Sequence, residues 1–436
     1  MPFAEILAGS SLATGALALI ATLALMPPLM VIGRRLGLVD RPDARKRHEA
    51  DTPLVGGPAV LGGALLSLLL LQAHDEFAVL IPITLGICLL GVLDDRLDLS
   101  PITRVVFQLA AASAMILGGL RLYEIGDLIG QGPVVLGTSF GLFFTALCTV
   151  GVINSINMID GLDGLAGSIL LVSFGALMAL AVGSAPEYAA AVPMLAAFSG
   201  ALLAFLAFNL RLIVPRARVF LGDSGSMVLG FVLLWYCIRL TQGADAPVSP
   251  VLAGWIFGLP LMDTVSVMVG RLVRGRSPLS AGRDHFHHLL VDAGASVNAT
   301  VAIMVGVHVS IVLIGCAFNT VPAAEPFLFW AFVLMVIAHH FLTPRLVRHL
   351  VKRPTLPGVA APFPPAPRPR TLSAAASRES SFASRQTSDR QTRARNTPQS
   401  PRRAPPGPRV TGRGQTGPDR RGTERTPERD TEATKP

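Results

Sequence analysis

Long apolar segments alternate with short polar ones through most of the 436-residue chain. A helix of about 18–20 apolar residues crosses roughly 30 Å of hydrocarbon. The pattern predicts eleven such spans, at residues 10–32, 57–73, 77–93, 102–120, 137–156, 166–183, 190–208, 224–241, 249–270, 297–317 and 326–343. Because every backbone polar group must be bonded inside lipid, we expect an all-α polytopic membrane protein, a bundle of about eleven transmembrane helices.

Basic residues gather in alternate connections between these spans. The connections after the first, third, seventh, ninth and eleventh spans carry arginine or lysine, whereas the others offer little beyond Arg121 and Arg239. Since basic residues concentrate in cytoplasmic loops, the pattern predicts an external N-terminus and a cytoplasmic C-terminus. In the external segment Arg121–Ser139, glycines between β-prone residues predict a small hairpin.

The composition changes after residue 352. Residues 353–436 are rich in Pro, Arg, Ser, Thr and Gly and carry 17 Lys+Arg against 7 Asp+Glu, whereas residues 1–352 carry 20 against 21. Such a segment buries too little apolar surface to fold, so we expect a disordered basic cytoplasmic tail after a membrane domain at 1–352. The positive surplus therefore belongs to the tail, where it can attract anionic lipids, and it does not indicate nucleic-acid binding.

Five polar stretches interrupt the apolar pattern, at residues 40–58, 94–99, 154–163, 209–224 and 271–288. They follow the first, third, fifth, seventh and ninth predicted spans, so all five are expected on the cytoplasmic face. Carboxylates and amides near hydrocarbon are costly and are functional candidates by default. A transporter would instead place its carboxylates near the middle of the membrane. The shared side therefore predicts one site at the cytoplasmic ends of the helices.

Two acidic motifs carry ligands that suit a hard cation. The adjacent carboxylates of Asp94 and Asp95 repel each other, which a divalent cation or a shared proton relieves, although aspartates also cap helix ends. Asn154, Asn157 and Asp160 recur every three residues and therefore face one side of a helix end. The glycines that follow allow a phosphate to approach the backbone, or simply allow tight helix packing.

Two further motifs point to phosphate. Phe220–Ser226 opens a predicted span, where free N–H groups favour phosphate, although the stretch is equally a helix cap. Asp223 would repel phosphate unless it binds a metal. His285, His287 and His288 lie beside arginines, and their spacing suits zinc poorly, so they are better donors to nucleotide phosphates, or surface histidines. The sequence contains no P-loop or HExxH motif and no GxGxxG after a predicted strand, which argues against a nucleotide-driven pump.

These motifs together resemble the polyprenyl-phosphate N-acetylhexosamine-1-phosphate transferase family, glycosyltransferase family 4. The resemblance covers about residues 30–295 and follows the family's order of motifs: VDRPDARKRHEADTPLVGG (39–57), LDDRLDLSPITR (93–104), NSINMIDGLDGLAG (154–167), FLGDSGSMVLG (220–230) and PLMDTVSVMVGRLVRGRSPLSAGRDHFHHLL (260–290). The chain resembles the WecA-like branch more than the MraY branch, because Asp98 follows the aspartate pair and the histidine loop reads His-Phe-His-His.

The resemblance implies transfer of an N-acetylhexosamine 1-phosphate, with GlcNAc 1-phosphate as the first expectation. The donor would be the UDP-N-acetylhexosamine, the acceptor undecaprenyl (or decaprenyl) phosphate, and UMP would be released. The resemblance also implies Mg²⁺ (or Mn²⁺), a bacterial inner (plasma) membrane location with a cytoplasmic active site, and a homodimer. The lipid-diphosphate sugar would initiate synthesis of a cell-envelope polysaccharide. Phospho-N-acetylmuramoyl-pentapeptide transfer, within the family, and membrane transport, outside it, are the alternatives.

The resemblance also assigns roles to individual residues. Asp94 is the expected base toward the lipid phosphate, with Asp95 beside it at the site. The other assignments are Asp160 and Asp163 as catalytic residues, Asp223, Asn154 and Asn157 as metal ligands, and His285, His287, His288, Arg283, Lys46 and His48 as contacts to the substrates.

Overall fold

The computed structural model describes residues 3–40, 51–71, 77–277, 282–321 and 324–351. The predicted substrate contacts Lys46 and His48 and the predicted tail at 353–436 lie outside these ranges. Internal contacts divide the chain after Pro354, and the unit Met1–Pro354 contains all of the described residues.

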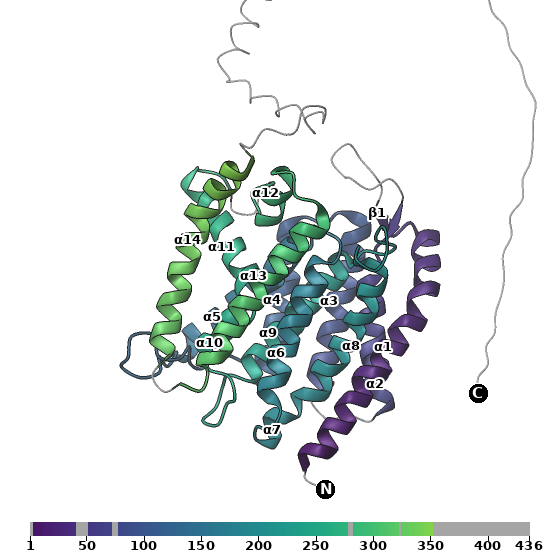
Figure 1. Cartoon of the computed structure of the whole chain (residues 1–436). Coiled ribbons are helices and arrows are strands. Elements are labelled where there is room, and N and C mark those ends of the chain that lie inside the picture. The colour runs from purple at the N-terminus through teal and green to yellow at the C-terminus, as the bar shows by residue number, and fades with distance from the viewer. Residues whose placement is uncertain (1–2, 41–50, 72–76, 278–281, 322–323, 352–436) are drawn as a thin grey trace, which may run out of the picture. The chain divides into compact units, whose positions relative to one another are not determined.

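Most of the described residues belong to α-helices. The elements are α1 (Phe3–Leu36), β1 (Val39–Asp40), β2 (Thr52–Pro53), α2 (Gly56–Leu70), α3 (Phe77–Leu97), α4 (Pro101–Leu117), α5 (Thr138–Ile159), α6 (Leu165–Ala181), α7 (Pro186–Ala189), α8 (Ala191–Asn209), α9 (Gly222–Arg239), α10 (Pro250–Ile256), α11 (Gly258–Val273), α12 (Phe286–Asp292), α13 (Val297–Phe318) and α14 (Glu325–Val351). The two short strands pair antiparallel. Figure 1 shows the longer helices side by side, with α12 and β1 at one end and α7 at the other.

The helices coincide with the predicted spans. Each of the eleven predicted segments lies on a helix or on a pair of helices. Within the described ranges, six helices are long and apolar enough to cross a membrane, or seven if the bent pair α10 and α11 counts as one span, and α2, α4 and α6 are shorter apolar helices. These are the helices of a multi-pass membrane protein, whereas eleven spans and an external N-terminus stay predictions.

The predicted span at 249–270 is two helices rather than one. The axes of α10 and α11 differ in direction by 82°. Pro260 lies in the first turn of α11 and has no N–H to donate to the carbonyl of Ile256, the last residue of α10. Because the helix is interrupted there, α11 takes a new direction and packs against α14, α5 and α13.

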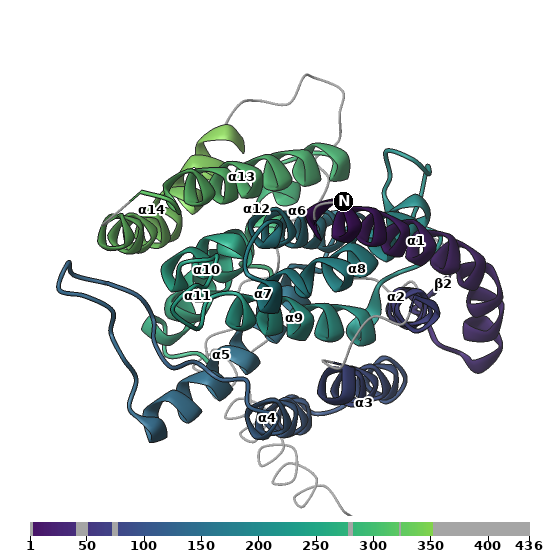
Figure 2. The ribbon, with the colours of Figure 1, turned by 90° about the horizontal axis from the view of Figure 1, so that it is seen from below.

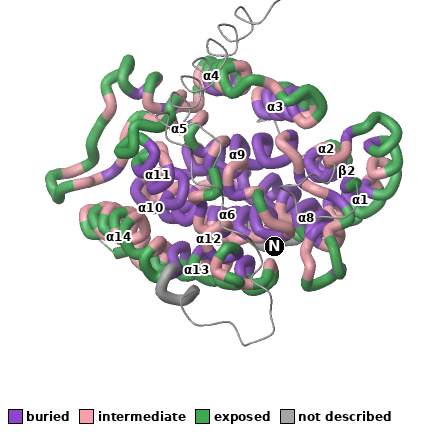
Figure 3. The backbone as a smooth tube through the Cα atoms, turned by 90° about the horizontal axis from the view of Figure 1, so that it is seen from above, coloured by how far each residue is buried: buried purple, intermediate pink, exposed green. Residues whose placement is uncertain are grey.

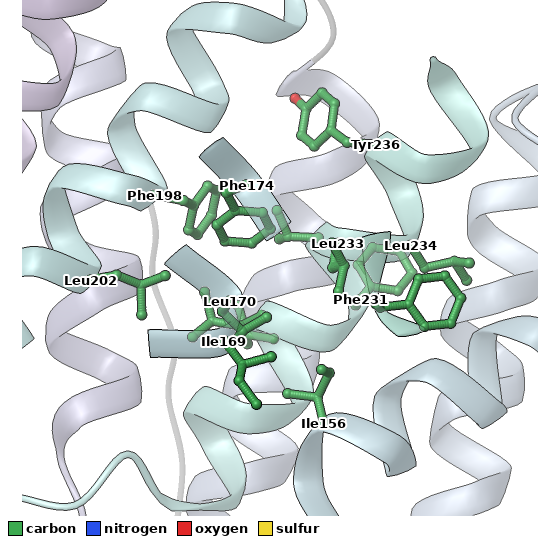
Figure 4. Packing of buried hydrophobic residues seen from close by; sticks show 14 of the residues in the cluster. Ile156, Ile169, Leu170, Phe174, Phe198, Leu202, Phe231, Leu233, Leu234 and Tyr236 are labelled. Atoms are coloured by element: carbon green, nitrogen blue, oxygen red, sulfur yellow. The ribbon is translucent and has the colours of Figure 1, made fainter. Parts of the chain in front are cut away.

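Helix α9 forms the centre of the bundle. Its residues from Ser224 to Ile238 are all buried, and α2, α3, α5 and α6 pack around it. Figures 2 and 3 show α9 enclosed by other helices, with exposed residues concentrated on the outer elements. Phe174 of α6 packs against Phe198 of α8, and Phe231 of α9 belongs to the same buried cluster (Figure 4). A helix that is apolar on all sides needs such complete cover.

Glycines allow α9 to begin close to its neighbours. A methyl group at Gly57 of α2 would overlap the backbone of Gly225, and one at Gly91 of α3 would overlap the backbone of Ser224. Small residues at such crossings let helix backbones approach closely. The first turn of α9 is thereby held against α2 and α3, next to the aspartates near the end of α3.

The segment between α4 and α5 forms the predicted hairpin, as a single bridge rather than a ladder. Glu124 and Val135 make an isolated antiparallel bridge, and Leu136 N–H donates to the carbonyl of Tyr123 at 2.7 Å. The carboxylate of Asp127 closes the turn by accepting hydrogen bonds from backbone N–H groups of the residues that follow it.

Candidate active site

The carboxylate of Asp95 caps the start of α9 from the neighbouring helix α3. Its Oδ1 accepts a hydrogen bond from Asp223 N at 2.9 Å, and its Oδ2 accepts one from Ser224 N at 3.4 Å. The first N–H groups of a helix have no partner within it, and the helix dipole also favours a carboxylate there. Gly222, with φ +73°, makes room for the cap, because a methyl group there would lie 2.6 Å from Asp95 Oδ2.

Asp94 holds an arginine that comes from α4. The side chain of Asp94 is 1% exposed, its Oδ2 lies 3.2 Å from Arg104 Nε, and its Oδ1 accepts from Leu99 N at 2.8 Å. Arg104 Nη1 lies 3.8 Å from Asp223 Oδ2. The guanidinium therefore stands between two carboxylates and offsets their repulsion. Arg104 was absent from the predicted site residues, although it ends the LDDRLDLSPITR motif.

Asp223 is the point at which side chains from several helices meet. Besides the contacts with Asp95 and Arg104, its Oδ1 accepts from Asn157 Nδ2 of α5 at 2.5 Å, and the same Nδ2 lies 2.9 Å from Ser226 Oγ. The side chain of Asp223 is still 30% exposed. It is thus held in place by its neighbours and open to a ligand.

Asn154 faces a different neighbour from Asn157. Its Nδ2 donates to Gln108 Oε1 of α4 at 2.7 Å, and Gln108 Nε2 lies 3.7 Å from Met227 Sδ of α9. Both hydrogen bonds are at least partly buried, one turn deeper in the bundle than Asp223. The structure therefore brings the predicted metal ligand Asn157 to Asp223 and takes Asn154 to Gln108 instead.

Asp160 ends α5 and lies within the electrostatic reach of the other carboxylates. It is half-buried at the C-cap position. Burial, followed by the charges of Asp223, Asp95 and Asp163, raises the pKa of Asp160 to about 8. Asp160 therefore carries a proton at neutral pH, and a cation bound to its oxygens would displace that proton. We refer to Asp94, Asp95, Asp160 and Asp223 as the carboxylate cluster.

The loop that follows Asp160 is fixed by the loop before α9. Asp163 Oδ2 pairs with Arg211 Nε at 2.6 Å, and Gly164 N donates to Asn209 Oδ1, also at 2.6 Å. These bonds join the predicted polar stretches 154–163 and 209–224. Asp163, predicted as a catalytic residue, is thus engaged in an ion pair that holds the loop.

The end of the predicted polar stretch 40–58 reaches the same place. Phe220 N–H donates to the carbonyl of Pro53, and Gly56 N–H donates to the carbonyl of Phe220, each at 2.9 Å. The turn between β2 and α2 is therefore bonded to the residues just before α9. With the cap from α3, this fixes the first turn of α9 from two sides.

Asp263 in α11 anchors the histidine segment, by which we mean residues 285–288. Asp263 is buried, its Oδ2 lies 2.8 Å from His285 Nδ1, and its Oδ1 accepts from Phe286 N at 2.9 Å. His339 Nε2 of α14 lies 3.5 Å from the same Oδ1. Because a carboxylate favours the tautomer with a proton on the facing nitrogen, Asp263 orients the ring of His285. Asp263 stands in the PLMDTVSVMVGRL motif, yet it was not predicted as a site residue.

His287 brings the histidine segment against the loop after Asp160. Its side chain is buried, and neither ring nitrogen has a hydrogen-bond partner within the described part of the chain. A methyl group at Gly161 would overlap His287 Nε2. Burial, followed by the charge of His288, lowers the pKa of His287 to about 3, so the ring is neutral at pH 7. A buried polar group without a partner indicates a place where a ligand atom can bind.

The other predicted contacts of this region lie further from the cluster. The ring centroid of His288 is 4.1 Å from that of His287, and burial lowers the pKa of His288 as well. Arg283 is exposed and pairs with Asp292 at 2.7 Å. Arg283 would therefore have to leave Asp292 before it could contact a substrate phosphate.

The cluster offers oxygen ligands that suit Mg²⁺ or Mn²⁺. Among the described residues, no three Asp, Glu, His or Cys side chains converge closely enough to form a cation cage. Mg²⁺ is usually held by one or two carboxylates together with substrate phosphates rather than by such a cage. Asp223 is partly exposed and Asp160 half-buried, so these two carboxylates fit that pattern.

Comparisons with known proteins agree with this arrangement. Residues 77–241 match the sequence profile of Glycosyl transferase family 4. An Escherichia coli K12 protein named undecaprenyl-phosphate alpha-N-acetylglucosaminyl 1-phosphate transferase is 38% identical over 265 residues, which are 60% of this chain and 71% of that relative. Proteins of the same name from Yersinia pestis (36% over 262 residues, 60% and 71%) and Haemophilus influenzae (35% over 345 residues, 76% and 94%) are also similar.

Apolar helices whose ionisable side chains meet at helix ends define a multi-pass membrane protein with a polar site. Within that class, the chain belongs to glycosyl transferase family 4, and its relatives place it in the WecA-like branch, as the motifs predicted.

Proposed function

We propose that the protein transfers GlcNAc 1-phosphate from UDP-GlcNAc to undecaprenyl (or decaprenyl) phosphate and releases UMP. The names of the relatives support the lipid acceptor and the sugar. In this reaction an oxygen of the lipid phosphate attacks the β-phosphorus of the donor. The bond from that phosphorus to the bridging oxygen breaks, and the electron pair leaves with UMP.

The observation that carries this proposal is the convergence of side chains on Asp223. Asp95 and Arg104 approach it from α3 and α4, and Asn157 approaches it from α5. Two phosphate-bearing substrates must lose their mutual repulsion before they react, so a site for them needs fixed charges and cation ligands. Asp223 and Asp160 would hold Mg²⁺ (or Mn²⁺), which supplies positive charge to the phosphates when bound.

The contacts favour supporting roles for Asp94 and Asp95. Asp94 was expected to accept a proton from the lipid phosphate, but one of its oxygens faces Leu99 N and the other faces Arg104. Asp95 uses both oxygens to cap α9. We therefore assign Asp94 to the positioning of Arg104, whose guanidinium would contact a substrate phosphate, and Asp95 to the positioning of Asp223.

The histidine segment would bind the nucleotide part of the donor. His287 is neutral and has two ring nitrogens without partners. One of them faces Gly161, next to Asp160. A neutral imidazole can donate one hydrogen bond and accept another, which suits a phosphate oxygen on one side and a base or sugar group on the other.

The reaction would take place at the cytoplasmic face of a bacterial inner membrane, because the UDP-sugar donor is made in the cytoplasm. The lipid-diphosphate product would then start a cell-envelope polysaccharide. A homodimer remains an expectation of the family resemblance.

The test is a reconstituted reaction of the purified full chain with undecaprenyl phosphate, Mg²⁺ and one donor at a time. UDP-GlcNAc should yield UMP and a lipid-linked sugar in equal amounts. UDP-GalNAc and UDP-N-acetylmuramoyl-pentapeptide, tested in parallel, should give much lower rates. Absence of product with every donor would refute the transferase, and a preference for the pentapeptide donor would move the chain to the other branch of the family.

A further inference from the structure

A cavity of about 450 Å³ lies between α11 and α14. Its ionisable lining comes from both helices and from the residue just before the histidine segment: Asp263, Arg274, Asp284, His339, His340 and Arg345. None of the carboxylate cluster lines it. The volume is of the size that holds a small ligand or a lipid headgroup.

Two arginines and two aspartates line the cavity, and they differ in their partners. Its two acidic residues already have partners, since Asp263 accepts from the histidine segment and Asp284 Oδ2 lies 3.6 Å from Arg271 Nε. Arg274 and Arg345 line the cavity from α11 and α14, and neither forms an ion pair with a described residue. Guanidinium groups without a carboxylate partner favour an anion, and phosphate oxygens match their geometry.

A buried hydroxyl adds to the polar lining. Ser266 Oγ on α11 is buried, and within the described ranges it has no hydrogen-bond partner. Leaving such a group unpaired costs free energy, so a bound oxygen atom would stabilise it. Across the cavity, Thr343 Oγ1 lies 3.0 Å from His339 Nδ1, and His339 in turn contacts Asp263.

The residues around the cavity face lipid. Val273 of α11 is 81% exposed, and Leu342 and Leu346 of α14 are 60% and 61% exposed. On a membrane-spanning helix, exposed apolar side chains of this size contact acyl chains. The cavity therefore lies beside an apolar surface that the acyl chains of a lipid would cover.

We propose that this cavity binds the phosphate headgroup of an anionic phospholipid. Arg274 and Arg345 hold the phosphate, and the acyl chains lie along the exposed apolar side chains of α11 and α14. A bound lipid bridges the two helices and thereby supports Asp263, which lines the cavity and contacts both His285 and His339. This site is separate from the proposed acceptor site, because the transferred phosphate must reach Asp223.

The experiment titrates the purified full chain in detergent with phosphatidylglycerol and counts bound lipid by native mass spectrometry. Removing both charges with Arg274→Gln and Arg345→Gln should weaken binding roughly tenfold or more. Arg121→Gln with Arg239→Gln, which removes two charges that do not line the cavity, should leave binding unchanged. Arg274→Lys with Arg345→Lys, which keeps both charges, should retain most of the binding even if the glutamine variant folds poorly.

Several outcomes would overturn the proposal. Equal loss of lipid in the Arg121 and Arg239 control would show that bound lipid reflects overall charge. Equal binding of phosphatidylcholine would remove the anion requirement. Displacement of the lipid by millimolar inorganic phosphate, at the same affinity, would assign the cavity to a free anion. The readout is bound lipid, so the result does not depend on the proposed transferase activity.

Discussion

The carboxylate cluster and the histidine segment are built by opposite means. In the cluster, backbone N–H groups, an amide and a guanidinium hold the carboxylates around Asp223. In the histidine segment, burial keeps His287 neutral, and the anchor Asp263 contacts the neighbouring His285 and Phe286. The carboxylate cluster is suited to bind a cation together with charged phosphate groups. The histidine segment is suited to hydrogen bonds from an uncharged imidazole.

The difference shows how a membrane-embedded site can divide its work. Carboxylate charges are stabilised at the start of α9 because the helix dipole and Arg104 offset them. In the histidine segment, where a further charge would lack such partners, neutral imidazoles provide the hydrogen-bonding groups. The two regions meet where Gly161 lies against His287, so substitutions can address each region and this contact separately.

The largest effect is expected from Asp223→Asn. The amide keeps the shape of the side chain but removes the charge that would hold a cation, so turnover should fall roughly 10²- to 10³-fold. Asp245→Asn, an exposed aspartate outside the site, is the matched control. Initial rates of UMP release measure both, and near-normal turnover in Asp223→Asn would remove Asp223 from cation binding.

The next largest effect concerns the pair formed by Asp94 and Arg104. If Asp94 acts by holding Arg104, then Asp94→Asn and Arg104→Gln should each lower kcat/KM roughly 10- to 100-fold, and the double variant should lose little more. The measurement is a double-mutant cycle with pH–rate profiles. If instead the two single losses in kcat/KM multiply in the double variant, and the acidic limb of the pH–rate profile is missing only in Asp94→Asn, then Asp94 is the proton acceptor.

The contact between the two regions gives a smaller effect. Gly161→Ala places a methyl group on His287 Nε2, which should displace the ring and lower kcat/KM about tenfold. Gly151→Ala, in α5 with open space around it, is the matched control and should leave activity intact. Equal activities in the two variants would show that the position of His287 is unimportant for the reaction.

A separate effect, on stability rather than on activity, depends on pH. Because the pKa of Asp160 is raised to about 8 in the folded protein, the folded state binds a proton there that the unfolded chain releases at about pH 4. Without divalent cations, the stability of the unaltered protein should therefore fall as pH rises from about 4 to about 8. The stability of the Asp160→Asn variant should fall less over the same range. Thermal unfolding midpoints across this range measure the difference, and parallel curves would contradict the raised pKa.

Much of the fold could be predicted because the local hydropathy of the sequence indicates where membrane helices lie. The break after Ile256 was missed because the apolar pattern continues across it, although Pro260 was a signal for an interruption. The shared location of the polar stretches was predicted from span order alone. The contacts of Asp95, Asn157 and Gly161 confirm that these stretches converge.

The partners within the site could not be predicted in the same way. The spacing of Asn154 and Asn157 indicates a common side of α5, but it cannot tell that one meets Gln108 and the other Asp223. Arg104 was treated as a sign of orientation only. Asp263 and His339 lie on helices whose contact depends on packing between distant parts of the chain.

The most direct test of the two-region account is the binding of UDP-GlcNAc to the purified full chain, by calorimetry with and without Mg²⁺. We expect Mg²⁺ to strengthen binding to the unaltered protein and to Gly161→Ala, with Gly161→Ala weaker under both conditions. Asp223→Asn should bind the donor but no longer respond to Mg²⁺. A full Mg²⁺ response in Asp223→Asn, or unchanged affinity in Gly161→Ala, would contradict the division of the site into a region for charge and a region for the nucleotide.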